Sequence, residues 1–170
     1  MKEYFFPTDQ QLKKVLSFFG RDDISKVKLG ITLGFLTKIN SAKVEKNMQK
    51  YGVTKSKFNA LVIIFHEDRG NGVPLSEIAK GLFVNKSTIT GLIDGLVSLG
   101  LIKRVVPTTG DRRRILASLT DKGKTLLMDI LPSHFRLIDK IFSSLTSDEI
   151  EQFQHIAEKI MDTGYEDEEL

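Results

Sequence analysis

The stretch NKSTITGLIDGLVSLGLIKRVVPTTGDRRRILASLTDKG, residues 85–123, decides the fold of this chain. Its first part predicts a helix, because apolar residues at positions 89, 92, 93, 96 and 97 recur at the spacing of one buried face. Asn85 can cap the start of this helix, and Gly100 suits a left-handed helix end. Small polar or basic side chains remain near the exposed first turn, where they can donate hydrogen bonds into a groove: Lys86, Ser87, Thr88 and Thr90.

Two apolar segments after this helix predict a β-hairpin. Residues 101–106 and 115–119 are rich in branched apolar side chains, which favour strands, and Pro107 to Gly110 separates them as a turn. A basic run is more often a solvated surface than a binding site. This one would be presented by a hairpin directly after a helix that could enter a DNA major groove. The run consists of Asp111, Arg112, Arg113 and Arg114.

Residues 85–123 resemble the recognition helix, wing and helix restart of MarR-type transcriptional regulators. The most specific features are Asp111-Arg112-Arg113 and the later Leu119-Thr120-Asp121-Lys122-Gly123. The family usually shows an Asp-x-Arg wing and a leucine-threonine-acidic-lysine-glycine restart. The resemblance implies a mainly α fold, with a winged helix-turn-helix domain, a small β-hairpin wing and long N- and C-terminal dimerisation helices.

The order of elements on both sides of this stretch also fits the resemblance. It assigns residues 27–163 to a MarR-like domain, with dimerisation helices at about 27–51 and 121–163 and a DNA-binding lobe at about 54–120. Residues 1–26 are predicted to be an extension with a short helix over Thr8 to Phe19. Gly164 should end the last helix, so residues 164–170 are predicted to be an acidic tail.

Capping residues and apolar faces define the remaining helices. Thr54, Thr120 and Thr146 can each cap a helix, the last through a Thr-x-x-Glu capping box, and Pro132 should bend the long helix that contains it. Two buried faces are predicted before the recognition helix, one of Phe58, Leu61, Val62 and Phe65 and one of Leu75, Ile78, Ala79 and Leu82.

The first and last long helices carry more apolar surface than one small winged-helix core can cover. One explanation is that they pack only on their own domain. The resemblance implies instead that they intertwine between two subunits, so we expect a homodimer.

Composition excludes several classes of protein. The chain has 41% hydrophobic and 28% charged residues and no long apolar run, so we expect no membrane span and, without a secretory signal pattern, a cytoplasmic protein. It has no cysteine, which excludes disulfides, thiolate metal sites and thiol redox sensing within this chain.

Charge is distributed unevenly along the chain. The net charge is only +3, but residues 75–124 hold nine Lys/Arg against four Asp/Glu, and residues 145–170 hold one Lys against nine Asp/Glu. Such segregation can arise by chance in a soluble protein. Together with the helix and hairpin pattern, the basic centre predicts double-stranded DNA as its partner.

No catalytic, metal or cofactor site is predicted. His66-Glu67-Asp68 could suggest a metal or proton-transfer site, but His134 and His155 stand at no metal-binding spacing from it. The chain contains neither a GxxxxGK[ST] phosphate loop nor a GxSxG nucleophile turn. An enzyme therefore has no positive support.

We therefore predict a transcriptional repressor that binds a palindromic operator as a homodimer and is released by a small-molecule effector. Asn85 and the polar residues after it would face the major groove. The wing would place Arg113 in or over the minor groove, and the resemblance implies that Asp111 orients it by a salt bridge. Adjacent strand residues point to opposite sides, so Arg112 and Arg114 are predicted to contact phosphates. The resemblance also implies a small aromatic or anionic effector, whose pocket residues the sequence does not assign.

The recognition helix departs from the family at Gly91 and Gly95, where relatives often carry large polar residues. Each glycine weakens a helix by about 1 kcal/mol relative to alanine and removes a side chain that could contact DNA. Either the helix lies unusually close to DNA or affinity depends more on the wing. The alternative function is a dimeric winged-helix interaction protein with weak or non-specific DNA binding.

Overall fold

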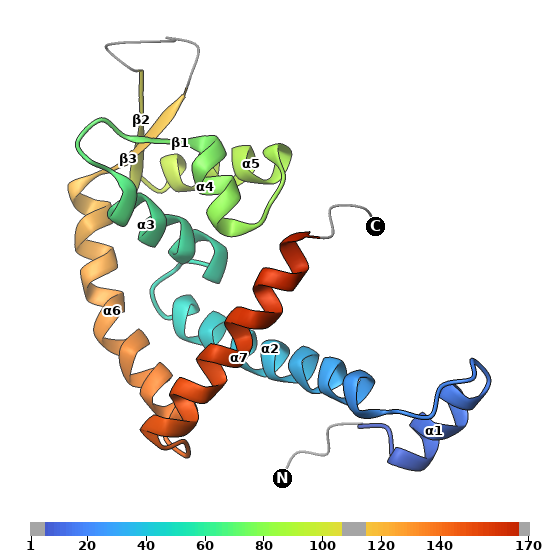
Figure 1. The fold of residues 1–170 in the computed structure, drawn as a ribbon. Coiled ribbons are helices and arrows are strands. Elements are labelled where there is room, and N and C mark those ends of the chain that lie inside the picture. The colour runs from blue at the N-terminus through green and yellow to red at the C-terminus, as the bar shows by residue number, and fades with distance from the viewer. Residues whose placement is uncertain (1–5, 107–114, 167–170) are drawn as a thin grey trace. The chain divides into compact units, whose positions relative to one another are not determined.

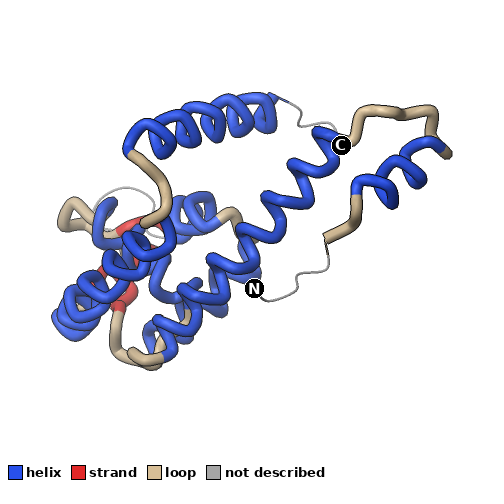
Figure 2. The backbone as a smooth tube through the Cα atoms, turned by 90° about the horizontal axis from the view of Figure 1, so that it is seen from below, coloured by secondary structure: helices blue, strands red, loops and turns tan. Residues whose placement is uncertain are grey.

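The computed structural model describes residues 6–106 and 115–166, with side chains up to residue 162. Helices dominate, as the sequence predicted (Figures 1 and 2). The helices are α1 (Asp9–Ser17), α2 (Ser25–Gln49), α3 (Lys55–Glu67), α4 (Leu75–Leu82), α5 (Lys86–Ser98), α6 (Asp121–Phe142) and α7 (Ser147–Glu166). The strands are β1 (Val73–Pro74), β2 (Ile102–Val105) and β3 (Leu116–Leu119).

The chain divides into two compact units, Met1–Leu127 and Met128–Leu170, so that α6 begins in the first and ends in the second. The first unit holds the sheet and the helices up to the start of α6. The assignment of the long helices to dimerisation is not tested by this division and stays a prediction.

Side-chain caps set where many of the helices begin. Thr8, Thr54, Asn85, Thr120 and Thr146 each accept the backbone N–H three residues ahead, over 2.9–3.3 Å. Such a bond satisfies one of the donors that the first helical turn leaves free. The caps predicted at Thr54, Asn85, Thr120 and Thr146 are therefore confirmed.

The sheet has one strand more than the predicted hairpin. Its order is β1-β3-β2, with all pairs antiparallel; β2 and β3 pair from Ile102 with Leu119 to Val105 with Leu116. β1 contains only two residues, too few to show a strand periodicity in the sequence. Gly72 introduces it with a φ of +82°, and a Cβ there would lie 3.0 Å from the Cβ of Leu116.

The core of the first unit corrects one predicted face. On α3, Phe58 and Leu61 are buried as predicted, but Ile64 is fully buried while Phe65 is 42% exposed. The apolar face could continue from Leu61 either to Ile64, three residues later, or to Phe65, four residues later. α3 packs on β3, and in this packing Ile64 is the buried residue. The short helix α4 buries Ile78 and Ala79 as predicted, whereas Leu75 and Leu82 are half-buried.

The end of α7 also differs from the prediction. Gly164 does not end this helix, which continues to Glu166, so three residues of the predicted acidic tail are helical. A glycine weakens a helix interior but does not stop it unless the backbone turns left-handed there. Pro132 lies within α6, which continues past it as one helix.

Large apolar side chains remain exposed on the long helices. Leu29 and Leu36 of α2 are each 50% exposed, and on α7 the same holds for Phe153 at 49% and Ile156 at 54%. Within the described residues, no helix is both long and apolar enough to cross a membrane.

Candidate nucleic-acid interface

The first turn of α5 presents the polar residues that the sequence singled out. Lys86, Ser87, Thr88 and Thr90 are all exposed, and Asn85 is exposed at the cap. Of the face predicted to be buried, Ile89, Ile93 and Leu96 are 0–1% exposed and Leu92 is half-buried. Val97 is 37% exposed, so the prediction was wrong for that residue. The free N–H groups of a helix start add partial positive charge there, which favours an anion such as phosphate.

Several of these side chains already have hydrogen-bond partners within α5. The side-chain oxygen of Asn85 accepts from the Thr88 backbone N–H at 2.9 Å and from the Ser87 hydroxyl at 2.7 Å. The Thr90 hydroxyl donates to the Lys86 carbonyl at 2.9 Å. Asn85 therefore has a structural role at the helix start in addition to any contact it makes with a ligand.

A charged pair joins α5 to the sheet. Arg104 of β2 forms an ion pair and hydrogen bond with Asp94 of α5, and both side chains remain about half exposed. The contact fixes the side of α5 that faces β2. Sequence analysis did not single out either residue, because neither helix nor strand periodicity indicates which charged groups meet.

A groove of about 630 Å³ lies beside the start of α5. Basic groups from three elements line it: Lys80 of α4, Lys86 of α5 and Arg104 of β2. The rest of the lining is polar Ser76 and Thr90 and the apolar residues Pro74, Leu75, Ala79, Val84, Ile89 and Ile115. Lys80 and Ser76 were missed from the sequence because α4 was considered only for its buried face.

The predicted wing residues Asp111, Arg112, Arg113 and Arg114 lie outside the described residues. The strands that lead to them are described. The pair nearest to them joins Val105 of β2 to Leu116 of β3.

The two glycines of α5 have different surroundings. A Cβ at Gly91 would meet nothing within 4 Å, whereas one at Gly95 would lie 3.3 Å from Cε of Lys57 on α3. Gly95 is thus partly covered by a lysine side chain of the same unit. Of the two, only Gly91 leaves open surface where a relative could present a larger side chain.

Asp68, which was considered as part of a metal site with His66 and Glu67, instead organises a turn. Its carboxylate accepts the backbone N–H groups of Gly70 at 2.8 Å and Gly72 at 2.9 Å, and the hydroxyl of Ser118. Burial raises the pKa of Asp68, but these hydrogen bonds and the charge of Lys124 outweigh that effect and hold the pKa below its usual 3.8. The described residues hold no cluster of three or more potential metal ligands.

Comparison with known proteins places this geometry in a family. The model of the MarR family matches residues 51–114. The Bacillus subtilis HTH-type transcriptional repressor YetL is 31% identical over 131 residues, which cover 77% of this chain and 77% of that protein. The chain belongs to the MarR family.

Solved structures share the fold of this MarR-family chain. The S. aureus MepR–DNA complex matches with a TM-score of 0.72 at 21% identity, over 79% of this chain and 96% of that one. CouR from Rhodococcus jostii RHA1, bound to p-coumaroyl-CoA, matches with a TM-score of 0.69 at 23% identity, over 78% and 90%. Both likenesses support the winged helix-turn-helix fold.

Membership of the MarR family also settles the class of protein. The related proteins are named as transcriptional repressors and regulators, and this chain is a transcription regulator rather than an enzyme. In the winged helix-turn-helix fold α4 and α5 form the helix-turn-helix, and β2 and β3 form the base of the wing.

Proposed function

We propose that this MarR-family protein is a repressor that binds a palindromic DNA operator as a homodimer and is released by a small aromatic or anionic effector. The observation that carries the proposal is the exposed polar and basic start of α5 beside the groove that Lys80 and Arg104 line. Asn85, Lys86, Ser87, Thr88 and Thr90 are the residues proposed to face the major groove.

Homodimer formation is supported by apolar surface that one chain leaves uncovered. Leu29 and Leu36 of α2 are half exposed, as are Phe153, Ile156 and Ile160 of α7. Burying such side chains stabilises a complex by about 25 cal/mol for each Å² removed from water. Two-fold symmetry would present two α5 helices to half-sites about one helical turn, or 10–10.5 base pairs, apart.

The wing is proposed to add contacts in or over the minor groove. Arg113 would enter that groove, Asp111 would orient it, and Arg112 and Arg114 would contact phosphates, since adjacent strand residues point to opposite sides. Arg113→Ala should weaken operator binding by about 1–3 kcal/mol and leave the melting temperature unchanged. A lower melting temperature with unchanged affinity of the folded protein would assign the arginine to hairpin stability instead.

The first experiment selects bound DNA from a random pool and then measures affinity for the selected site as salt rises. A regulator that displaces several counterions should lose affinity on the order of a thousandfold between 50 and 200 mM salt, while preferring its site over random DNA. Absence of an enriched site, with weak binding to every sequence, would favour the alternative interaction protein.

Variants then test the recognition helix. Lys86→Ala and Thr88→Ala should each weaken operator binding by about 1–2 kcal/mol without changing the fold. Lys38→Ala, which removes an exposed lysine of α2, is the matched control and should not change affinity. Equal effects of Lys86→Ala and Lys38→Ala would count against a DNA-facing α5.

The effector is the part of the proposal that rests most on relatives, among them the p-coumaroyl-CoA-bound CouR. Titrating benzoate, as a small aromatic anion, into the protein–operator complex should release DNA at a saturable concentration. Acetate at the same ionic strength controls for salt. Since the chain has no cysteine, peroxide should not release DNA through thiol chemistry.

A further inference from the structure

The N-terminal helix α1 exposes an apolar face that its own unit does not cover. Val15 is 55% exposed, Phe18 77% and Phe19 75%. These three residues stand three and four apart, so they share one side of the helix end. A nine-residue helix is marginal in water without tertiary packing, and exposing two phenylalanines adds to that cost.

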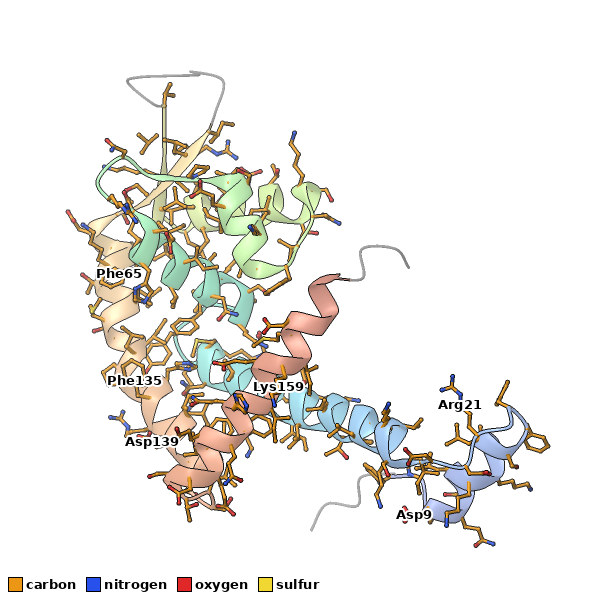
Figure 3. All side chains as sticks on the ribbon, in the orientation of Figure 1. Asp9, Arg21, Phe65, Phe135, Asp139 and Lys159 are labelled. Carbon is orange, nitrogen blue, oxygen red and sulfur yellow. The ribbon has the colours of Figure 1, made fainter. Side chains whose placement is uncertain are left out.

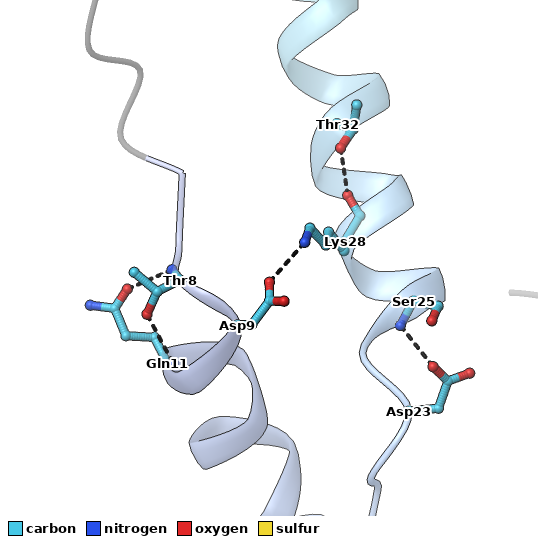
Figure 4. A network of polar contacts seen from close by, with 7 residues as sticks. All are labelled: Thr8, Asp9, Gln11, Asp23, Ser25, Lys28 and Thr32. Carbon is cyan, nitrogen blue, oxygen red and sulfur yellow. Dashed lines mark hydrogen bonds and ion pairs between the residues drawn. The ribbon is translucent and has the colours of Figure 1, made fainter.

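The first unit holds α1 mainly at its beginning. Asp9 pairs with Lys28 of α2 at 2.8 Å (Figure 4). Leu12 is the buried residue of the helix. The Asp9–Lys28 pair is exposed to solvent, and exposed ion pairs contribute little to stability. Phe6 adds a ring contact with Phe35 of α2 at 5.9 Å between centroids. These contacts fix the start of α1 and leave Phe18 and Phe19 at its other end uncovered.

The charged residues next to Val15, Phe18 and Phe19 indicate what kind of surface could pack on this face of α1. Lys14 stands four residues before Phe18 and therefore on the same side of the helix, and Lys13 precedes it. Arg21, which Figure 3 labels, follows the helix but stands next to Asp22 and Asp23, so it adds no net positive charge. Asp9, the acidic residue of α1, is already paired with Lys28. The apolar face of α1 is thus bordered by basic groups, which favour an apolar surface bordered by acidic ones.

Of the described long helices, α7 has that character. Ile150, Phe153, Ile156, Ile160 and Met161 form its exposed apolar face, with exposed fractions of 37–55%. Glu151, Glu158 and Asp162 stand seven and four residues apart and form one row, and Glu158 lies three residues before Met161, at the edge of that face. By contrast, α2 carries five lysines and one glutamate, so it would repel the lysines of α1.

We propose that α1 of one protomer packs its Val15, Phe18 and Phe19 face on α7 of a second copy of this chain, with Lys13 and Lys14 facing the acidic row of Glu151, Glu158 and Asp162. The inference rests on the proposed homodimer and adds to it a contact made by the N-terminal extension. In a two-fold dimer the contact occurs twice, so each substitution acts twice.

The first test measures dimer dissociation by sedimentation for the full-length Phe18→Ser/Phe19→Ser variant. Its dissociation constant should rise on the order of a hundredfold, because four phenylalanine side chains lose their cover. Phe83→Ser is the matched control: Phe83 is 81% exposed in the turn between α4 and α5, and its replacement should leave dimerisation unchanged. An unchanged dimer in the double variant would overturn the inference.

A charge exchange tests the contact without removing any apolar group. Lys13→Glu/Lys14→Glu in one batch and Glu151→Lys/Glu158→Lys in another should each weaken the dimer, by roughly two- to tenfold. Mixing the two batches should restore it as a heterodimer, since each α1 then meets an α7 of opposite charge. Mixing Lys38→Glu/Lys43→Glu, which alters α2, with the second batch should give no such preference.

The outcomes separate the two proposals. A wild-type protein that stays monomeric at micromolar concentration contradicts both the homodimer and the contact of α1. A wild-type dimer with no heterodimer preference after mixing overturns the contact alone. Charge variants that lose stability individually and gain nothing on mixing would place the partner of α1 within its own chain, which also overturns the inference.

Discussion

The winged-helix lobe and the long helices differ in how far their apolar side chains are exposed to solvent. In the lobe, Ile78, Ile93 and Leu96 are all 0% exposed. On α2 and α7, Leu36 and Phe153 at similar helical spacing are about half exposed. The lobe is closed by contacts among α3, α4, α5 and the sheet within one chain. Leu36 of α2 and Phe153 of α7 are not covered in this way within their own units.

The contrast separates two uses of the same amphipathic pattern. A periodic apolar face predicts that other residues pack on it, but it does not indicate whether those residues belong to the same chain or to a second one. In the lobe the cover comes from neighbouring elements of the same chain, so the cost of removing a buried side chain there should not depend on protein concentration. For the long helices we propose a second copy as the cover, so substitutions there should act through dimerisation.

The largest expected effect is at the junction of the lobe with α6. A Cβ at Gly123 would lie 1.9 Å from the carbonyl oxygen of Leu101, which also accepts the Thr120 backbone N–H at 3.1 Å. Gly123→Ala should therefore destabilise the protein by about 4 kcal/mol or more, since backbone must move. Urea unfolding followed by circular dichroism measures it.

Gly91→Ala is the matched control for that substitution. It also adds a methyl group to a helical glycine, but nothing lies within 4 Å of the new atom. It should stabilise the protein by about 1 kcal/mol through helix propensity. If the two substitutions had similar effects, the close approach of α6 to Leu101 would not be a determinant of the lobe.

Local chemistry explains how much of the fold the sequence reveals. Thr54, Asn85, Thr120 and Thr146 act as caps because a cap needs only residues three apart in the chain. The choice between Ile64 and Phe65 depended on β3, which lies far along the sequence, and so the local pattern favoured the wrong residue. β1 was missed because two residues carry no period, and its pairing with β3 is set by the fold around Gly72.

The second prediction compares the two kinds of apolar face directly. Ile93→Ala, in the closed lobe, should cost about 3 kcal/mol at every protein concentration, because it leaves a cavity. Phe153→Ala, on the exposed face of α7, should change the stability of a dilute sample by less than about 0.5 kcal/mol. At high concentration it should lower the melting temperature, since it weakens the dimer.

Thermal unfolding over a hundredfold range of concentration checks both variants. Wild-type and Ile93→Ala curves should shift together as concentration rises, and the shift should be smaller for Phe153→Ala. An equal shift for Phe153→Ala would mean that its face is not part of a concentration-dependent contact, and the contrast between the two regions would then lose its proposed cause.

The candidate site was predictable to a different degree from the fold. Lys86, Ser87, Thr88 and Thr90 could be found because residues left off a buried face must be exposed. Arg104 and Lys80 could not, since their place beside α5 depends on how β2 and α4 pack against it. The surroundings of Gly95 could not be predicted either, since the contact with Lys57 depends on how α3 packs against α5.

The smallest expected effect concerns the polar contact of Asp68, after the end of α3, with Ser118 of β3. Asp68 accepts from Ser118 with one carboxylate oxygen and from Gly70 and Gly72 with the other. Asp68→Asn keeps the oxygen that faces Gly70 and Gly72 and replaces the other with an amide nitrogen, which can only donate to the Ser118 hydroxyl, so a charge-assisted bond becomes a neutral one of opposite direction. It should cost about 1 kcal/mol at pH 7, and Ser118→Ala about the same. The double variant should cost little more than either one, because both act on the same contact.

Acid should erase the difference between wild-type protein and Asp68→Asn. The pKa of Asp68 is held below its usual 3.8 in the folded protein, so the carboxylate contributes stability above that value and loses it as pH falls through the lower folded value. Asparagine does not titrate, so the wild-type advantage should be constant from pH 7 to about 5 and shrink below about 4. Urea unfolding at each pH measures the gap. A gap that stayed constant to pH 3 would show that the charge of Asp68 does not stabilise the turn, and that apolar packing alone closes the lobe.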